Sequence, residues 1–333
     1  MSSPTVIAEK KLSGSRALVT GGLGFIGSSL VRRLVKLGAQ VTILDALIEG
    51  QGGHEFNVAG LDGDIRIDRR DIRDQQALME LIPGQDYLFN LAGQTSHMGS
   101  MKNPFVDLEV NAKSQLAIVE TCRSMNPGVK IVFTSTRQIY GRPDYLPVDE
   151  KHPLRPVDVN GVNKLAGEGF HRLYNEVYGI RSCVLRLTNT YGPRMRVKDA
   201  AQTFVGIWIR RILEGQDFEV WGGGQLRDFT YVEDLVDALI LCAERREADG
   251  RTFNLGGEML SLHDLAEALV RVHGAGSFVV KEYPAARAAI EIGDYRGDYS
   301  AIKDAVGWQP RTGIDEGLTL TLRYFEDTLS RYI

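Results

Sequence analysis

The chain has 333 residues, of which 43% are hydrophobic and 25% are charged, and its formal net charge is −4 at pH 7. These values are typical of an ordinary soluble globular protein, long enough for one large α/β unit or for two domains. The slightly negative charge supplies no general basic surface for a nucleic-acid backbone, so nucleic acid is excluded as an expected partner.

The sequence predicts neither a membrane segment nor a disulfide or metal site. The first residues contain no apolar run long enough for a signal peptide, and no later segment approaches the roughly 18 apolar residues of a membrane span. The expected location is therefore the cytoplasm, without a membrane partner. Cys122, Cys183 and Cys242 lie far apart within apolar runs, so we expect buried thiols.

Strand and helix patterns alternate from the N-terminal region onward. Compact apolar runs typical of buried strands and helical patterns between them predict a parallel sheet covered by helices on both faces. The expected fold class is α/β, with a Rossmann-type doubly wound parallel sheet. The predicted strands are 16–21, 40–45, 86–93, 130–136 and 181–187, and the predicted helices are 28–38, 107–125 and 160–179.

A smaller C-terminal domain is expected to follow the sheet, because loops interrupt the alternation beyond residue 190. The stretch at 251–257 nevertheless has the apolar character of another buried strand that returns to the first domain. The expected division is a dinucleotide-binding domain over 1–190, rejoined by about 225–257, and a substrate-binding domain over 191–224 and 258–333.

Three glycines, Gly21, Gly24 and Gly27, lie between the first strand and the first helix. Their missing side chains let the backbone close on a pyrophosphate, and the helix N-terminus supplies partial positive charge. Asp45, at the end of the next strand, is close to the offset of a carboxylate that binds ribose hydroxyls and repels a 2′-phosphate. The alternative is a tight turn without a ligand, but this context favours an NAD site and disfavours NADP.

Motifs along nearly the whole chain carry a resemblance to a known family. The chain resembles the extended short-chain dehydrogenases/reductases, specifically the NAD-dependent nucleotide-sugar epimerases and dehydratases that are similar to UDP-glucose 4-epimerase. The motifs are VTGGLGFIG (19–27), RDIRD (70–74), NLAGQ (90–94), STRQIYG (135–141), RLTNTYGPR (186–194), LRDFTYVEDL (226–235), FNLGG (253–257) and GWQP (307–310).

The resemblance implies a set of ligand-binding residues. Those implied for NAD, besides the three glycines and Asp45, are Phe25, Ile26, Asp71, Ile72, Leu91, Ala92 and Lys164. Those implied for a nucleotide-diphosphate sugar are Gln94, Asn189, Arg227 and Arg296. A surface ion pair is the alternative for each arginine. The motif around Arg227 favours substrate binding, and for Arg296 the two alternatives stay open.

The catalytic helix departs from the family pattern at residue 160. Family members carry a Tyr-x-x-x-Lys pair, whereas this chain has Asn160 before Lys164, with the preceding proline spacing kept. A carboxamide does not titrate in water and cannot take a proton from a hydroxyl. By resemblance Thr136 holds the reacting oxygen, so the expected catalytic residues are Thr136, Asn160 and Lys164.

Another group must replace the tyrosine base if the protein is an enzyme of this kind. The candidates are His97, Tyr140, Tyr145 and Lys164 itself. A second Tyr-x-x-x-Lys, Tyr299 with Lys303, is interpreted as an ordinary helix face.

The residues after Thr136 bear on the reaction. Sugar dehydratases of this family have Asp-Glu there, and this chain has Arg137 and Gln138, which favours epimerisation. A dehydratase or other lyase with unusual groups is one alternative, and a catalytically lapsed scaffold or sensor is another. A homodimer is expected through the helices around 106–125 and 161–177, which have more apolar positions than one sheet face uses.

Overall fold

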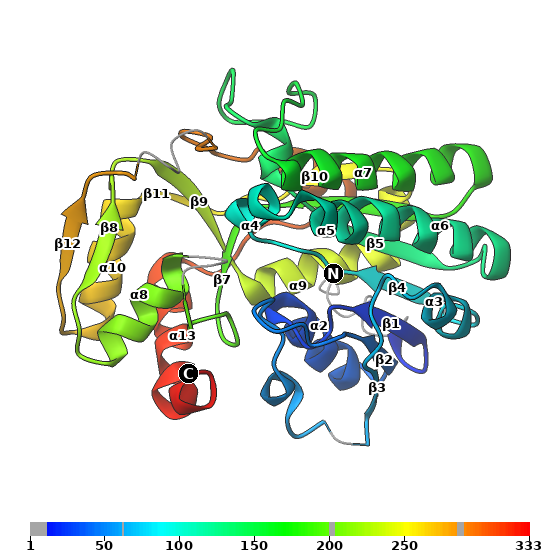
Figure 1. The fold of residues 1–333 in the computed structure, drawn as a ribbon, viewed down its shortest axis with the longest axis horizontal. Coiled ribbons are helices and arrows are strands. Elements are labelled where there is room, and N and C mark those ends of the chain that lie inside the picture. Colours follow the sequence, from blue (N-terminus) through cyan, green and yellow to red (C-terminus); the bar gives the residue numbers. More distant parts are fainter. Residues whose placement is uncertain (1–11, 62, 200–203, 285–289) are drawn as a thin grey trace, which may run out of the picture.

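The computed structural model describes residues 12–61, 63–199, 204–284 and 290–333 (Figure 1). Residues 1–11, which begin the segment considered above for a signal peptide, lie outside these ranges. Among the described residues, no helix combines the length and the apolar character needed to cross a bilayer.

The described residues form a seven-stranded sheet in the order β10-β6-β5-β4-β1-β2-β3, and every pairing in it is parallel. This confirms the doubly wound α/β fold. Its strands are β1 (Arg16–Thr20), β2 (Gln40–Leu44), β3 (Ile65–Asp68), β4 (Tyr87–Asn90), β5 (Lys130–Thr136), β6 (Ser182–Leu187) and β10 (Thr252–Asn254). The edge strand β3 was not among the predicted strands, because its partly exposed sequence lacks a continuous apolar run.

Helices cover both faces of this sheet. Side chains alternate in direction along a strand, so apolar side chains on both faces need a covering layer. Leu18 and Ile131 pack in the cluster with α3 (Gln75–Leu81), α6 (Ser114–Met125) and α7 (Val159–Tyr178). Their neighbours Val19 and Val132 belong to the cluster with α2 (Phe25–Lys36) and α9 (Val232–Glu244). Successive strand residues point to opposite faces, so β1 and β5 contribute to both clusters.

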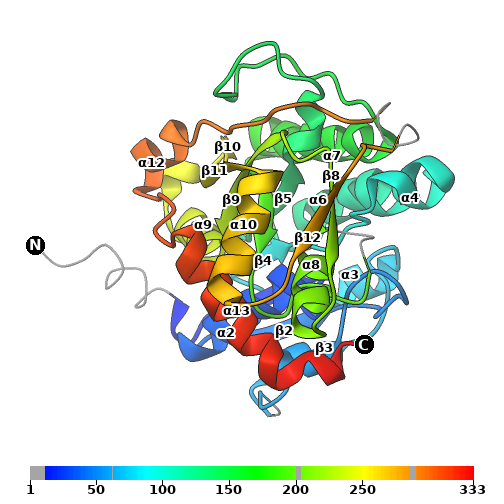
Figure 2. The ribbon, with the colours of Figure 1, turned by 90° about the vertical axis from the view of Figure 1, so that its left-hand side faces the viewer.

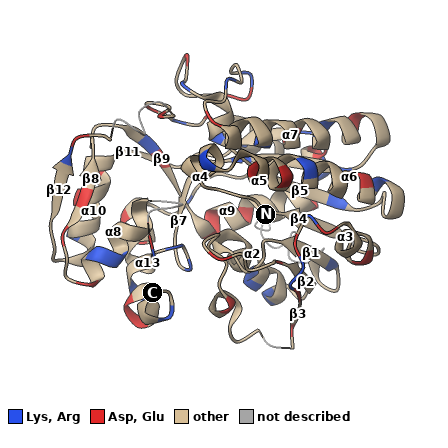
Figure 3. Ribbon diagram, viewed as in Figure 1, with Lys and Arg blue, Asp and Glu red and all other residues tan. Residues whose placement is uncertain are grey.

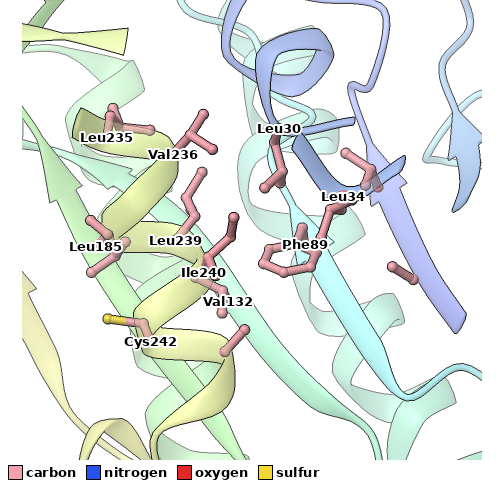
Figure 4. Close-up of a cluster of buried hydrophobic side chains, with 14 of the residues drawn as sticks. Leu30, Leu34, Phe89, Val132, Leu185, Leu235, Val236, Leu239, Ile240 and Cys242 are labelled. Atoms are coloured by element: carbon pink, nitrogen blue, oxygen red, sulfur yellow. The ribbon is translucent and has the colours of Figure 1, made fainter. Parts of the chain in front are cut away.

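The cluster between α2 and α9 holds these two helices against the sheet (Figure 4). Leu30 and Leu34 of α2 and Leu239 of α9 are fully buried with Phe89 of β4. Burial of each such side chain stabilises the folded state by about 1.5–3 kcal/mol relative to leaving it exposed to water. Cys122, Cys183 and Cys242 are also buried and free, as expected.

The predicted helix over 107–125 is not one regular α-helix. It comprises α5 (Pro104–Leu108), a π-helical segment (Glu109–Lys113) and α6. The π segment adds a wider turn, and Asp107 and Asn111, on either side of its start, are both fully buried. A π-bulge inside an α-helix frequently marks a functional site.

A smaller part of the molecule lies beside the large sheet (Figure 1). In the described chain it contains a three-stranded sheet, β11-β9-β7, and a two-stranded sheet, β12-β8. Helices α10 and α13 run along it (Figure 2). Its elements are β7 (Asn189–Tyr191), β8 (Phe218–Trp221), β9 (Leu226–Tyr231), β11 (Glu258–Ser261), β12 (Phe278–Lys281), α8 (Phe204–Leu213), α10 (Leu262–His273) and α13 (Ile314–Thr328).

The chain crosses between the two parts several times. After β9 it returns with α9 and β10 to the large sheet, and then continues into β11. The described ranges also contain the helices α4 (His97–Lys102) and α12 (Ser300–Val306) and the short 3-10 helices η1 (Glu55–Val58), η3 (Arg137–Tyr140), η4 (Arg246–Ala248) and η5 (Leu329–Arg331). Basic and acidic residues are interspersed along the ribbon (Figure 3).

Candidate active site

A cavity of about 450 Å³ lies along the carboxyl ends of the central strands. In a doubly wound sheet this edge is the expected place for a ligand, because the loops there diverge where the strand order reverses. The sequence-predicted residues that line it are Gly21, Gly24, Phe25, Ile26, Gly27, Asp45, Asp71, Ile72, Leu91, Ala92, Gln94, His97, Thr136, Asn160 and Lys164.

The glycine turn forms part of the cavity wall. Gly21 has a φ of +70°, and a Cβ there would lie 2.9 Å from the backbone nitrogen of Ala92. A Cβ on Gly27 would lie 2.1 Å from the carbonyl oxygen of Gly21. Both positions therefore need glycine for steric reasons, and the turn brings bare backbone to the cavity wall at the start of α2.

Asp45 stands beside this turn. Its carboxylate accepts hydrogen bonds from the backbone N–H of Leu23 at 2.9 Å and of Leu47 at 3.0 Å. Burial raises the pKa of Asp45, and these two hydrogen bonds oppose that rise. The carboxylate is thus held in place at the cavity wall, where it retains lone pairs for a hydroxyl ligand.

Asn160 also lines the cavity, and two acceptors determine the orientation of its side chain. Its side-chain Nδ2 donates to the backbone oxygen of Gln94 at 2.7 Å and to Oδ2 of Asp107 at 3.1 Å. Both amide hydrogens are therefore used. Among the described residues no donor is bonded to Asn160 Oδ1, so the side chain offers an acceptor to a ligand.

Asp107 is the centre of a cluster of carboxamides that the sequence analysis missed. Its buried carboxylate also accepts hydrogen bonds from Asn111 Nδ2 at 3.1 Å and from Asn163 Nδ2 at 2.8 Å. The local signal was the four-residue spacing of Asp107 and Asn111, which is too common to be decisive. The three side-chain amides and the nearby Lys164 ammonium offset the free-energy cost of burying the Asp107 carboxylate.

Lys164 contributes that ammonium one turn after Asn160 on α7. Its Nζ donates to the backbone oxygen of Thr134 at 3.1 Å. Burial lowers the pKa of Lys164 to about 8, although the charges of Asp107 and Glu168 act to raise it. A fraction of the side chain is therefore neutral near pH 7, and that fraction grows with pH.

His97, the first residue of α4, also lines the cavity and contacts a carboxylate. Its Nδ1 lies 2.8 Å from Oδ2 of Asp158. Asp158 caps α7 by accepting from the Gly161 N–H at 2.7 Å, and it accepts from Gln138 Nε2 at 3.0 Å. Although burial raises the pKa of Asp158, its contact with His97 and these hydrogen bonds keep it below the ordinary value.

The other candidate bases lie elsewhere. Tyr140 is fully buried, donates to Asn254 Oδ1 at 2.6 Å and accepts from Arg186, and burial raises its pKa to about 12. Tyr145 is exposed and donates to Asp149 at 2.8 Å, which raises its pKa. Neither tyrosine is part of the cavity wall.

Tyr299 and Lys303 behave as members of a helix. Tyr299 is the N-cap of α12, and its backbone oxygen accepts from the Lys303 N–H at 3.1 Å. The Tyr299 ring packs edge-on against Trp308. Neither residue lines the cavity.

Three residues expected for the substrate lie outside the cavity wall. Arg227 is buried, forms an ion pair with Glu291 and donates to the Gly293 carbonyl. Asn189 donates to the backbone oxygen of Asp228 at 3.3 Å. Arg296 is exposed on a loop.

The structure also adds cations and anions that the motifs did not indicate. Glu291 neutralises Arg227, and its position in a loop gave no sequence signal. Arg196 lines the cavity and is paired with Asp199 at 2.8 Å through Nε. A diphosphate at Arg227 would have to compete with the Glu291 carboxylate for the guanidinium.

The fold, the glycine turn and the acid at the end of β2 together define a dinucleotide-binding α/β protein. The sequence pattern of the NAD dependent epimerase/dehydratase family matches residues 17–256. The chain belongs to this family, as the resemblance implied.

Similarity to individual proteins covers nearly the full chain. UDP-glucose 4-epimerase of Mycolicibacterium smegmatis is 32% identical over 322 residues, which are 94% of this chain and 99% of that protein. dTDP-glucose 4,6-dehydratase of Streptomyces niveus is 29% identical over 323 residues, with coverage of 94% and 93%. The crystal structure of UDP-glucose 4-epimerase from Thermotoga maritima with UDP-glucose has a TM-score of 0.86 and 30% identity, covering 94% of this chain and 99% of that chain. Because both an epimerase and a dehydratase are similar, the choice between reactions rests on the site itself.

NAD is the cofactor of this family, and the cavity fits it. Glycines whose Cβ atoms would clash leave room for a pyrophosphate, and the Asp45 carboxylate at the cavity wall would suit ribose hydroxyls. Asp71, Ile72, Leu91, Ala92 and Lys164 also line the cavity.

Proposed function

We propose that the protein epimerises a nucleotide-diphosphate sugar by transient oxidation, with His97 as the base in place of the family's tyrosine. One observation carries this proposal: an imidazole in contact with a buried carboxylate shares the cavity with Thr136, Asn160 and Lys164. Histidine is a common general acid and base, and Oδ2 of Asp158 lies 2.8 Å from His97 Nδ1, close enough to restrict the position of the ring. The similarity to UDP-glucose 4-epimerases supports the substrate class.

Each residue then has a chemical role. His97 removes the proton from the sugar hydroxyl and later returns one, while Asp158 holds the imidazole. Asn160 accepts a hydrogen bond at Oδ1 and so orients that hydroxyl or a water. Thr136 Oγ1, which accepts from the Gln138 N–H at 3.2 Å, holds the same sugar oxygen. NAD, when bound, would supply the oxidising power as a reversible hydride acceptor for the sugar carbon.

Lys164 acts by charge and position. Its ammonium provides a positive field for a developing alkoxide and a donor for the ribose of the cofactor. With a pKa of about 8 it is also the alternative base. Turnover of the His97→Gln variant separates the two, since that variant loses the imidazole and keeps Lys164.

Epimerisation is favoured over elimination of water by the two residues after Thr136. Elimination needs an acid and a base beside the oxidised carbon. Arg137 cannot release its proton in this role, and Gln138 is a carboxamide engaged with Asp158. Epimerisation needs no such pair.

The decisive experiment is incubation of the NAD-loaded protein with a panel of nucleotide sugars, with products identified by NMR. We expect an epimer, and we expect deuterium placed at the oxidised carbon to be retained because the hydride returns to the same molecule. His97→Gln should lower turnover by about 10² to 10⁴. The control is His263→Gln, since His263 is exposed on α10, far along the chain from the cavity residues.

Other outcomes have definite meanings. A dehydrated keto-sugar would establish a lyase, and tight sugar binding without turnover would establish a binding scaffold. Loss of the deuterium to water would contradict the oxidation mechanism.

A further inference from the structure

Arg137 occupies the first position of η3, directly after Thr136. Its Nη2 donates to Asn189 Oδ1 at 3.2 Å, and its guanidinium carbon lies 5.5 Å from the centre of the Tyr295 ring. The residue is partly exposed, but its Nε atom is buried and has no hydrogen-bond partner among the described residues. The guanidinium therefore has donors available beyond the one that Asn189 uses.

The nearby charges do not pair with Arg137. Arg227 is occupied by Glu291. Asp228 is buried, accepts from the Gly297 N–H at 2.9 Å, and leaves its other oxygen without a partner. In the described ranges no carboxylate lies within the 4.0 Å of an ion pair from Arg137, so this guanidinium lacks a direct counter-ion.

The surroundings of Arg137 disfavour its unpaired positive charge. Burial, together with the positive charge of Arg227, lowers the pKa of Arg137 to about 10, although Asp228 and Glu291 act to raise it. The side chain still carries its charge at neutral pH. A bound anion would supply both the missing charge and the missing acceptor.

We propose that Arg137 binds a carboxylate on the sugar of the substrate, so that the protein is selective for a nucleotide-linked hexuronate or a sugar of similar acidity. This inference rests on the proposed function, in which Thr136 holds the reacting sugar oxygen. Arg137 follows Thr136, which lines the cavity, and its guanidinium contacts Asn189 and Tyr295 just outside the cavity wall. A sugar substituent that extends past Thr136 would meet this charge. The planar guanidinium matches the two oxygens of a carboxylate.

A diphosphate is the other oxyanion that such a substrate carries. The two arginines differ in their counter-ions: Arg227 is paired with the Glu291 carboxylate, whereas Arg137 has no carboxylate partner among the described residues. A comparison of the affinities for a nucleotide diphosphate alone, for its neutral sugar form and for its acidic sugar form distinguishes binding of the diphosphate from binding of the sugar carboxylate.

The test is calorimetric titration of the NAD-saturated protein with UDP, UDP-glucose and UDP-glucuronic acid. We expect UDP-glucuronic acid to bind roughly 10- to 100-fold more tightly than UDP-glucose, the range for one charge-assisted hydrogen-bonded contact. Arg137→Gln should abolish that preference and leave UDP affinity unchanged, and Arg137→Lys should keep part of it. The control is Arg323→Gln, because Arg323 is exposed on α13.

The wild-type comparison decides the matter even where a variant does not fold. Equal binding of the two sugars, or binding of neither, would overturn the proposal. An Arg137→Gln protein with weaker affinity for all three ligands would assign Arg137 to the diphosphate and also overturn it. Failure of this inference can be distinguished from failure of the proposed function. Turnover of neutral sugars alone would overturn the inference and leave the proposed epimerisation intact. Selective binding of the acidic sugar without turnover would support the inference and contradict the epimerisation.

Discussion

The side-chain amide of Asn160 lies 3.1 Å from the carboxylate of Asp107, which is fully buried. An amide hydrogen on a carboxylate cannot be exchanged for an amide oxygen without repulsion, so Asp107 determines which end of Asn160 is free. The free end is an oxygen, an acceptor at the position for which the family resemblance implies a phenol. Asn160 is thus suited to orient a hydroxyl and not to remove its proton.

Asn160→Ala is expected to reduce turnover only moderately, by less than about 10², whereas Lys164→Ala should lose about 10² or more. The reason is that the first change removes an orienting acceptor and the second removes cofactor positioning together with a positive field. Steady-state rates at saturating substrate would measure both. An Asn160 variant as impaired as the lysine variant would show that residue 160 takes part directly in proton transfer.

Asp107→Asn should destabilise the protein, by about 1–3 kcal/mol, because amides that now donate to a carboxylate would face another amide. It should also lower the pKa of Lys164 further, since the charge of Asp107 acts to raise it. Chemical denaturation gives the first quantity, and NMR titration of the labelled lysine gives the second. As a control, Asp304→Asn changes an exposed acid on α12. An unchanged lysine titration would mean that the two charges are not coupled.

The titration of Lys164 also predicts how stability depends on pH. Its pKa is about 8 in the fold against 10.5 for an ordinary lysine. Between these values the native side chain is neutral while the unfolded one still holds a proton, so the free energy of unfolding should rise with pH there. The wild type should therefore gain stability relative to Lys164→Met over this range in denaturant titrations. A constant difference between the two proteins would contradict the lowered pKa.

NAD should bind more tightly than NADP, because the Asp45 carboxylate would repel a 2′-phosphate. Calorimetric titration with the two cofactors checks this, and Asp45→Asn should narrow the difference. Asp64→Asn, an exposed acid near the edge strand β3, serves as the control. Tighter binding of NADP by the wild type would overturn the assignment of Asp45.

A homodimer through α6 and α7 is expected, since these helices expose apolar side chains. Leu116 is 39% exposed, Leu173 is 48% exposed and Val177 is 60% exposed. Sedimentation at micromolar concentration should report a dimer, and Val177→Asp should dissociate it. Val279→Asp, on the distant strand β12, should not. A wild-type monomer would contradict the expectation.

Features with local causes could be predicted from the amino-acid sequence. Apolar runs of strand length and helical periodicity specify the doubly wound sheet, because burial on two faces demands them. The glycine turn could be recognised in the same way, since the φ of Gly21 and the crowding at Gly27 exclude other side chains. The edge strand β3 escaped prediction because an edge is only partly buried.

Tertiary structure alone decided which side chains meet. Asp107 and Asn160 are 53 residues apart, and nothing in either segment predicts their contact. His97 and Asp158, and likewise Arg227 and Glu291, come from different elements whose relative position depends on packing. The same packing buries Tyr140 against Arg186 and Asn254 and removes it as a base. Such pairs arise from the register between packed elements, which the periodicity of a single segment does not encode.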